Sequence, residues 1–309
     1  MEQRELISGK WDPTARIIIF QGDNRQLLRT IPRESIHLVV TSPPYNVGKE
    51  YEVRSSLKEY VEAQRRIIRS CCRVLRPDGS LCWQVGNHIA PNGDVVPLDA
   101  LLYPIFKRQG LVLRNRIIWH YGHGLHLKRR FSGRYETILW FTKDTEDYYF
   151  DLDAVRVPQK YPGKRHYKGP KVGEYSGNLG GKNPSDFWDV PDDPGEIWDI
   201  PNVKANHVEK TEHPCQFQIA LITRLVRALT PRDGWVFDPY LGVGSAACAA
   251  ILEQRRAVGA EINPEYAAVA RERIGLASSG QLTYRPVERA LYEPVPGSPL
   301  TVRIDTAAG

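Results

Sequence analysis

Short apolar runs rich in β-branched residues alternate with longer amphipathic segments along this chain. Such runs are typical of strands that are buried on both faces of a parallel sheet, and the longer segments are typical of the helices that cover it. The predicted strands are residues 16–20, 36–40, 80–85, 113–119, 137–141, 235–237 and 257–260. The alternation predicts an α/β fold with a doubly wound, mostly parallel sheet.

The clearest helix signal is a capping box. Ser56 and Glu59 stand three positions apart, so each side chain can accept a hydrogen bond from the backbone N–H of the other residue. We expect this helix to run to Leu75 and to stop at residues 77–79, Pro-Asp-Gly, with a strand from residue 80. Three basic residues are expected on its solvated face: Arg65, Arg66 and Arg69.

Length and composition exclude several classes of protein. The 309 residues suit two domains, or one α/β domain with an insertion, and the 41% hydrophobic content supports a substantial core. No run approaches the roughly 20 apolar residues of a membrane span, and the charged N-terminus lacks a secretory pattern. The cysteines show no Cys-x-x-Cys spacing and are predicted to be reduced core residues of a cytoplasmic protein: Cys71, Cys72, Cys82, Cys215 and Cys248. The net charge of +6 suits a polyanionic partner such as double-stranded DNA.

A polar turn follows the predicted strand 36–40. Residues 41–46 read Thr-Ser-Pro-Pro-Tyr-Asn, and two consecutive prolines cannot continue a central strand. The turn therefore lies at the carboxyl end of a strand, where open α/β sheets bind their ligands. Its hydroxyl, two carbonyls without competing N–H groups and aromatic ring suit a planar base, held by its polar edge and stacked on its face.

A glycine-rich loop follows the predicted strand 235–237. Residues 238–245 read Asp-Pro-Tyr-Leu-Gly-Val-Gly-Ser, and an Ala-rich helix is predicted from residue 246 to about residue 254. This arrangement lets the backbone approach a ligand and directs helix N–H groups toward it. Glu261 ends the next strand and is placed to accept hydrogen bonds from ribose hydroxyls. Taken alone, the loop also satisfies a relaxed nicotinamide-dinucleotide fingerprint, so the loop by itself does not decide whether the cofactor is a dinucleotide or another molecule that contains ribose.

Together the two motifs resemble those of the DNA amino-methyltransferases. Residues 41–46 resemble motif IV, and residues 238–245 resemble motif I with Tyr240 in place of the usual Phe. The resemblance implies methyl transfer from S-adenosylmethionine to an exocyclic amine of cytosine or adenine. The Ser-Pro-Pro-Tyr form is commoner among N4-cytosine enzymes and the Asp-Pro-Pro-Tyr form among N6-adenine enzymes. The catalytic motif comes first, an order that resembles the permuted β-group, and the resemblance covers residues 17–273.

The resemblance implies a role for each site residue. Ser42 Oγ and the Pro43 carbonyl would accept the amine hydrogens, and Tyr45 would stack on a base flipped out of the duplex. The catalytic set is Ser42, Pro43, Pro44 and Tyr45. His213 and Pro214 precede an amphipathic helix that is expected to carry Phe217, and this segment resembles motif X. The residues implied for cofactor binding are Asp23, Thr41, His213, Pro214, Phe217, Asp238, Tyr240, Gly242, Gly244, Ser245, Glu261 and Asn263. Asp23 is an equally good helix cap, and both roles are compatible. No strong general base is evident in the motif, so the sequence does not identify the acceptor of the amine's proton.

Two segments are expected to contact DNA. Residues 120–130 carry three histidines and a basic run, which we interpret as a mobile loop that touches phosphates rather than as a metal site, since no ligand set is completed. Residues 153–206 occupy the position of the family's target-recognition insertion, and the alternative is a solvated loop. Its first half is basic and rich in tyrosine, and its second half is acidic. We expect Trp188, Trp198 and Ile200 to pack the second half against the rest of the protein. The DNA-binding set is Arg129, Arg130, Arg134, Lys160, Lys164, Arg165, Lys168 and Lys171.

The resemblance divides the chain into a catalytic half at 1–152, the insertion at 153–206, a cofactor-binding half at 207–276 and a tail at 277–309. We expect an N4-cytosine enzyme of a restriction-modification system, with a separate endonuclease and a homodimer as possible partners. The alternatives are an N6-adenine enzyme, an RNA methyltransferase and a non-enzymatic nucleic-acid binder. Residues 214–216, Pro-Cys-Gln, match the C5-cytosine nucleophile motif, but their order relative to the cofactor loop is reversed from that family.

Overall fold

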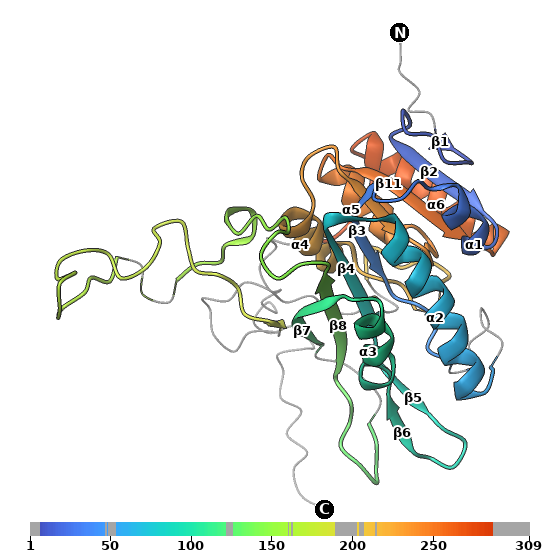
Figure 1. The fold of residues 1–309 in the computed structure, drawn as a ribbon, viewed down its shortest axis with the longest axis horizontal. Coiled ribbons are helices and arrows are strands. Elements are labelled where there is room, and N and C mark those ends of the chain that lie inside the picture. The colour runs from blue at the N-terminus through green and yellow to red at the C-terminus, as the bar shows by residue number, and fades with distance from the viewer. Residues whose placement is uncertain are drawn as a thin grey trace, which may run out of the picture.

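A sheet of nine strands, counted over the described residues, forms the centre of the molecule (Figure 1). The computed structural model describes residues 7–46, 48, 54–121, 126–159, 161, 163–188, 203, 207–213 and 215–286. The strands are β1 (Ile7–Ser8), β2 (Ile17–Gln21), β3 (Ile36–Thr41), β4 (Leu75–Val85), β7 (Val112–His120), β8 (Tyr135–Thr142), β9 (Phe187–Trp188), β10 (Trp235–Asp238) and β11 (Arg256–Glu261). A separate hairpin pairs β5 (Asn87–Ile89) with β6 (Val95–Pro97).

The sheet is mostly parallel. Its order is β1-β2-β11-β10-β3-β4-β8-β7-β9, and only β8 runs antiparallel to its two neighbours among the described strands. The strands nearest the two sequence motifs, β3 and β10, are adjacent and parallel although the chain connects them through all the intervening elements. The expected doubly wound α/β sheet is confirmed.

Helices cover both faces of the sheet. They are α1 (Asn24–Thr30), α2 (Leu57–Val74), α3 (Leu98–Arg108), α4 (Ile219–Leu229), α5 (Ser245–Leu252) and α6 (Pro264–Ser278). Successive β3 side chains point to opposite faces, as a strand requires. Leu38 and Val40 pack in the core that contains α4, α5 and α6, whereas Val39 packs in the core that contains α1, α2 and α3. This double burial explains why the strands read as continuous apolar runs.

The first long helix confirms the capping box. Ser56 is the N-cap of α2, its side chain accepts from the Glu59 N–H, and the Glu59 carboxylate accepts from the Ser56 N–H. The expected strand start was wrong, because β4 begins at Leu75 directly after the helix. A register shift pairs Leu75 with Ile36 and Ser80 with Leu38, so residues 77–79 are absorbed as an irregularity within the strand.

Two further expectations near α4 were wrong. The helix begins at Ile219, so Phe217 precedes it, and Gln218 is its N-cap. Cys215 is exposed rather than a core residue, whereas Cys71, Cys82 and Cys248 are buried and Cys72 is partly buried. No helix in the described part of the chain has both the length and the apolarity needed to cross a membrane.

The described part of the insertion projects from the body of the molecule, as the yellow-green trace of Figure 1 shows. Val157 and Lys182 form an antiparallel bridge at its neck, and Arg165 and Tyr175 form another farther out. Where the described part of the insertion returns to the sheet as β9, Trp188 is buried and lies against the guanidinium of Arg224, 4.5 Å from the ring centroid. This confirms the expected packing of Trp188, while Trp198 and Ile200 fall outside the described residues.

Candidate active site

A cavity of about 740 Å³ opens where β2, β3, β10 and β11 end, at the carboxyl edge of the sheet. This volume lies within the usual range for small-molecule sites. Most of the expected site residues line it: Asp23, Ser42, Pro43, Pro44, Tyr45, His213, Phe217, Asp238, Tyr240, Gly242, Ser245, Glu261 and Asn263. Thr41 and Gly244 lie outside its lining, and Pro214 lies outside the described residues.

Thr41 has a supporting position rather than a place on the cavity wall. It is fully buried, and its hydroxyl donates to Asp238 Oδ1 over 2.6 Å, which ties the end of β3 to the end of β10. The same Asp238 oxygen accepts from the Tyr240 N–H at 3.0 Å. The pKa of Asp238 is raised to about 7: burial is the main cause and the charge of Glu261 adds to it, while the hydrogen bonds from Thr41 and Tyr240 oppose the rise. One buried carboxyl group therefore joins the two sequence motifs.

The glycine-rich loop is shaped by two left-handed residues. Gly242 has φ +52° and Gly244, the N-cap of α5, has φ +81°, a region that costs other residues strain. A Cβ on Gly244 would lie 3.1 Å from the Ala270 Cβ of α6. The buried Arg273 guanidinium of α6 donates to the Val243 carbonyl at 2.6 Å, which fixes the loop from behind. No sequence signal had pointed to Arg273.

Glu261 already holds the loop backbone. Its carboxylate accepts from the Gly242 N–H and from the Asn263 N–H, each at 2.8 Å, and burial raises its pKa. The four lone-pair sites of a carboxylate leave room for ribose hydroxyls beside these bonds. Asn263 itself caps α6, with Oδ1 accepting from Glu265 N–H and Tyr266 N–H.

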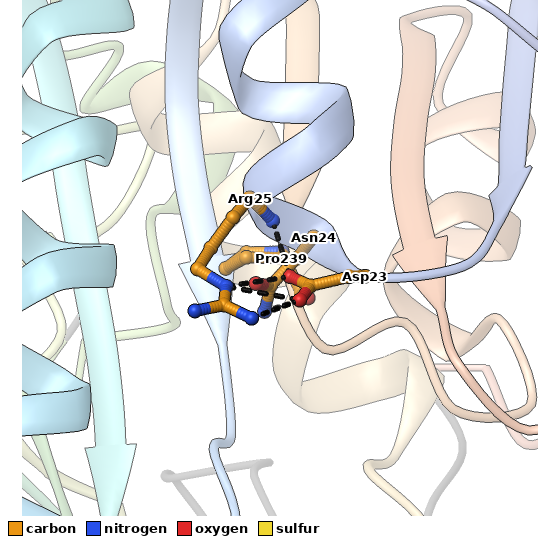
Figure 2. A network of polar contacts seen from close by, with 4 residues as sticks. All are labelled: Asp23, Asn24, Arg25 and Pro239. Atoms are coloured by element: carbon orange, nitrogen blue, oxygen red, sulfur yellow. Dashed lines mark hydrogen bonds and ion pairs between the residues drawn. The ribbon is translucent and has the colours of Figure 1, made fainter.

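Figure 2 shows how Asp23 is held at the start of α1. Its side chain accepts from the Arg25 N–H at 2.8 Å and forms an ion pair with the Arg25 guanidinium, which is the main reason for its lowered pKa. The capping role is therefore confirmed, and Asp23 also lines the cavity. Asn24, which the sequence did not indicate, donates to the Pro239 carbonyl at 3.0 Å and connects this turn to the glycine-rich loop.

His213 closes another side of the cavity. Its ring lies 4.7 Å from the Tyr266 ring, and Nδ1 accepts from the Cys215 N–H at 3.2 Å. Burial lowers the pKa of His213 to about 4, so the imidazole is neutral at physiological pH. A Cβ on Gly242 would lie 3.5 Å from His213 Nε2, so this ring and the loop are in close packing.

The corner of the cavity formed by residues 42–45 contains a residue that the sequence did not indicate, Glu136 of β8. Ser42 Oγ lies 3.0 Å from the Tyr45 hydroxyl, which donates to Glu136 Oε2 at 2.9 Å. Gln84 Nε2 donates to the same oxygen at 2.5 Å. Glu136 is partly buried and lines the cavity, and this burial raises its pKa.

The loop between β7 and β8 leaves the sheet at the edge where the cavity opens, since Val85 at the end of β4 pairs with Thr137 at the start of β8. Arg129 and Arg130 are exposed on it, and Phe131 is 99% exposed. Arg134 is partly buried at its base, where its carbonyl accepts from the Tyr121 N–H. No group of three metal-ligating side chains occurs among the described residues.

The basic half of the insertion is exposed. The described insertion members of the expected DNA-binding set are Lys164, Arg165, Lys168 and Lys171, and all four are exposed, while Lys160 lies outside the described residues. The Arg165 guanidinium stacks 4.0 Å from the Tyr175 ring centroid, and Lys168 Nζ lies 5.5 Å from that of Tyr167. The interleaved tyrosines thus act as platforms that order the cations.

Comparisons with known proteins agree with this geometry. The family model described as DNA methylase, which covers N6 and N4 methyltransferases, matches residues 36–272. The chain therefore belongs to the DNA methylase family of amino-methyltransferases. It is similar to the type II methyltransferase M.BglII of Bacillus subtilis, with 47% identity over 82% of this chain and 67% of that protein. It is also similar to the DNA adenine methyltransferase YhdJ of Escherichia coli K12, with 31% identity over 84% of this chain and 83% of that protein.

Solved structures extend the comparison. TTHA0409 of Thermus thermophilus, a DNA modification methylase in complex with S-adenosyl-L-methionine, is 26% identical and covers 89% of this chain and 99% of its own, with TM-score 0.60. The cytosine-N4-specific PvuII DNA methyltransferase covers 90% of this chain and 97% of its own at 22% identity, with TM-score 0.63, and it supports the fold alone. The protein is an S-adenosylmethionine-dependent DNA methyltransferase. The nicotinamide, C5-cytosine, RNA and non-enzymatic alternatives are thereby set aside.

Proposed function

We propose that the protein transfers the methyl group to the exocyclic N4 amine of a flipped cytosine at a specific DNA site, within a restriction-modification system. The main support for this proposal is the position of Ser42, whose side chain is a neutral hydroxyl. It precedes the Pro-Pro-Tyr turn and lines the same cavity as Gly242 and Glu261. A hydroxyl can accept from the amine or donate to the ring nitrogen, whereas an ionised Asp can only accept.

The cavity residues fit S-adenosylmethionine. Gly242 and Gly244 would let backbone come close to the ligand, and Glu261 offers carboxylate oxygens for ribose. Asp23 lines the same cavity, and the family resemblance implies that it would lie beside the cofactor's adenine. When bound, the cofactor supplies an electrophilic methyl group on a sulfonium. The protein's residues then act by alignment, a large source of rate in such reactions. Ser42 Oγ and the Pro43 carbonyl hold the amine hydrogens and direct the nitrogen lone pair, and Tyr45 supports the base.

An N6-adenine activity is the second candidate, because YhdJ, named a DNA adenine methyltransferase, shares 31% identity with this chain. Cytosine and adenine both present an amine beside a ring-nitrogen acceptor, so a turn that holds one can nearly hold the other. The deciding experiment incubates the protein with S-adenosylmethionine and unmethylated DNA, followed by mass spectrometry of the nucleosides. N4-methylcytosine is expected, and N6-methyladenine as the only product would reject the cytosine assignment.

The DNA contacts are proposed for two segments, the loop between β7 and β8 and the basic half of the insertion. Arg129 and Arg130 would neutralise phosphates, and the basic half of the insertion would do the same at the target site. Phe131 is the kind of exposed apolar side chain that can enter a base stack. Changing Phe131 to Ala is expected to reduce flipping of the target cytosine, read by the fluorescence of a 2-aminopurine placed beside it, with little change in nonspecific DNA affinity. Equal fluorescence in both proteins would leave Phe131 outside the flipping step.

The division of the chain at residues 152, 206 and 276 belongs to the same proposal, with the insertion as the target-recognition segment. The type II relatives support a companion endonuclease that acts separately on the same site. A homodimer is proposed from the β-group order and is tested by sedimentation of the protein with and without DNA.

A further inference from the structure

A hydrogen-bonded chain leads from the proposed catalytic hydroxyl to a carboxyl group on a different strand. Ser42 Oγ and the Tyr45 hydroxyl are 3.0 Å apart, and the Tyr45 hydroxyl donates to Glu136 Oε2 at 2.9 Å. Both distances are within the range of ordinary O–H···O bonds. Gln84 Nε2 donates to the same carboxylate oxygen and fixes its orientation.

We propose that Ser42, Tyr45 and Glu136 form a proton relay that takes the proton released from the target amine and leaves it on the Glu136 carboxylate. The proposal rests on the proposed catalytic role of Ser42. Methylation forms the N–C bond and breaks the S–C bond, whose electron pair stays on sulfur. The N–H bond then breaks, with its electron pair kept by nitrogen. The proton passes to Ser42 Oγ, the Ser42 proton to the Tyr45 oxygen, and the Tyr45 proton to Glu136.

The surroundings of Glu136 favour it as the end of the relay. Among the described residues it has no cationic partner, and its two hydrogen-bond donors are the neutral side chains of Tyr45 and Gln84. The charge of Glu136 also contributes to the raised pKa of Tyr121, whose main cause is burial, and Arg134 opposes that rise. A partly buried carboxylate in such neutral surroundings has a greater proton affinity than one in water. Glu136 can therefore hold the proton until solvent removes it after product release.

The relay geometry is built into the sheet. Gln84 and Glu136 come from neighbouring strands whose register pairs Gln84 with Ile138 and Val85 with Thr137. A Cβ on Gly86 would lie 3.2 Å from Tyr45 Cε2 and 3.6 Å from Glu136 Cγ, so the missing side chain lets both residues pack closely. Because the relay connects Glu136 to the base through Tyr45 and Ser42, Glu136 is a positioning residue. Its test must therefore separate proton transfer from simple support of the Tyr45 ring.

The experiment compares Tyr45→Phe, Glu136→Gln and the double variant in single-turnover methyl transfer, with saturating S-adenosylmethionine and DNA. Tyr45→Phe keeps the ring and removes the hydroxyl, and Glu136→Gln keeps the shape and removes the acceptor. Each is expected to slow methyl transfer by roughly 100-fold, a typical loss for a proton-transfer group. The double variant should be about as slow as the slower single one, since both changes break one relay.

The pH dependence of the methyl-transfer rate distinguishes the relay from a purely structural role of Glu136, because loss of structural support alone would not change it. The wild-type rate is expected to rise with pH to a plateau through one apparent pKa, and Glu136→Gln should lose that rise. Glu136→Asp should retain the pH dependence, with a lower maximal rate. If Glu136→Gln does not fold, the pH profile of Glu136→Asp is compared with that of wild type instead. Cofactor affinity measured by calorimetry should be unchanged in all variants.

Two outcomes would overturn the relay. One is a wild-type rate and pH profile in Glu136→Gln, and the other is a double variant whose loss is the product of the two single losses. Ser42→Ala separates this failure from failure of the proposed site. If Ser42→Ala is inactive while Tyr45→Phe and Glu136→Gln are fully active, only the relay is wrong; if Ser42→Ala is fully active, the proposed catalytic corner is wrong.

Discussion

Replacing Asp238 with Asn should make the stability of the protein less dependent on pH. The Asp238 carboxyl is 4% exposed and its pKa is raised to about 7, chiefly by burial. Its Oδ1 accepts from Thr41 and from the Tyr240 N–H, and the amide oxygen of Asn can accept the same two bonds. The substitution therefore removes the ionisation and keeps the hydrogen bonds that join β3 to β10.

The sign follows from proton linkage. The folded-state pKa of Asp238, about 7, lies above the ordinary value of 3.8, so the folded protein binds this proton more tightly than the unfolded chain does. The stabilisation is fully present below pH 3.8 and is lost as the pH rises through 7. At about 1.36 kcal/mol per pKa unit, wild type should lose roughly 2–3 kcal/mol from this group between pH 5 and pH 8. The Asn variant should not lose it.

The assay is urea unfolding followed by tryptophan fluorescence at pH 5, 6, 7 and 8 at constant ionic strength. The free-energy difference between Asp238→Asn and wild type should shift in favour of the variant as pH rises. Asp144→Asn is the matched control, because backbone hydrogen bonds lower the pKa of Asp144 and its contribution changes only in more acidic solution. His37 and His213, whose pKa values burial lowers to about 4, occur in every protein compared and cancel. Parallel stability curves for wild type and Asp238→Asn would refute the reasoning.

Three other predictions address function. Glu261→Ala should weaken S-adenosylmethionine binding by about 1–3 kcal/mol, because the carboxylate and its support of the Gly242 N–H are both lost; unchanged affinity in calorimetry would remove Glu261 from the ribose site. Cys215→Ser should retain most methyl transfer, since no thiol is needed, and a folded but inactive variant that yields no methylated base would contradict this. Neutralising Lys164, Arg165 and Lys168 together to Gln should flatten the salt dependence of DNA binding without changing cofactor affinity. An identical salt slope would assign these residues to solvent.

The sequence predicted those parts of the site that local chemistry determines. Residues 41–46 and 238–245 carry their turns and glycines within a few positions, and the structure brings both to one cavity. The capping box of Ser56 and Glu59 was correct for the same reason, because both partners belong to one helical turn. The start of β4 was not predicted, since it depends on a register shift against β3.

The missed residues all act across the fold. Glu136 belongs to β8 but meets Tyr45 from the turn after β3, and Arg273 of α6 reaches the Val243 carbonyl. Asn24, the first residue of α1, donates to the Pro239 carbonyl of the glycine-rich loop, which is far away in the chain. Nothing in the neighbouring residues of any of these three identifies its partner, because the partner is chosen by strand order and helix packing. Cys215 was wrong for the converse reason: an apolar neighbourhood in sequence did not bury it.

The pairing of β3 with β10 has a consequence for synthesis on the ribosome. β3 is complete once residue 41 has emerged, but β10 begins at residue 235, so one edge of β3 stays without its native neighbour for most of translation. An unpaired, apolar strand edge is a template for association with other chains. The nascent chain must therefore stay protected, by chaperones or by transient structure, until β10 appears and the Thr41–Asp238 hydrogen bond can close. In a methyltransferase with this order of motifs, the cavity at the ends of β3 and β10 therefore forms only after the second motif has been synthesised.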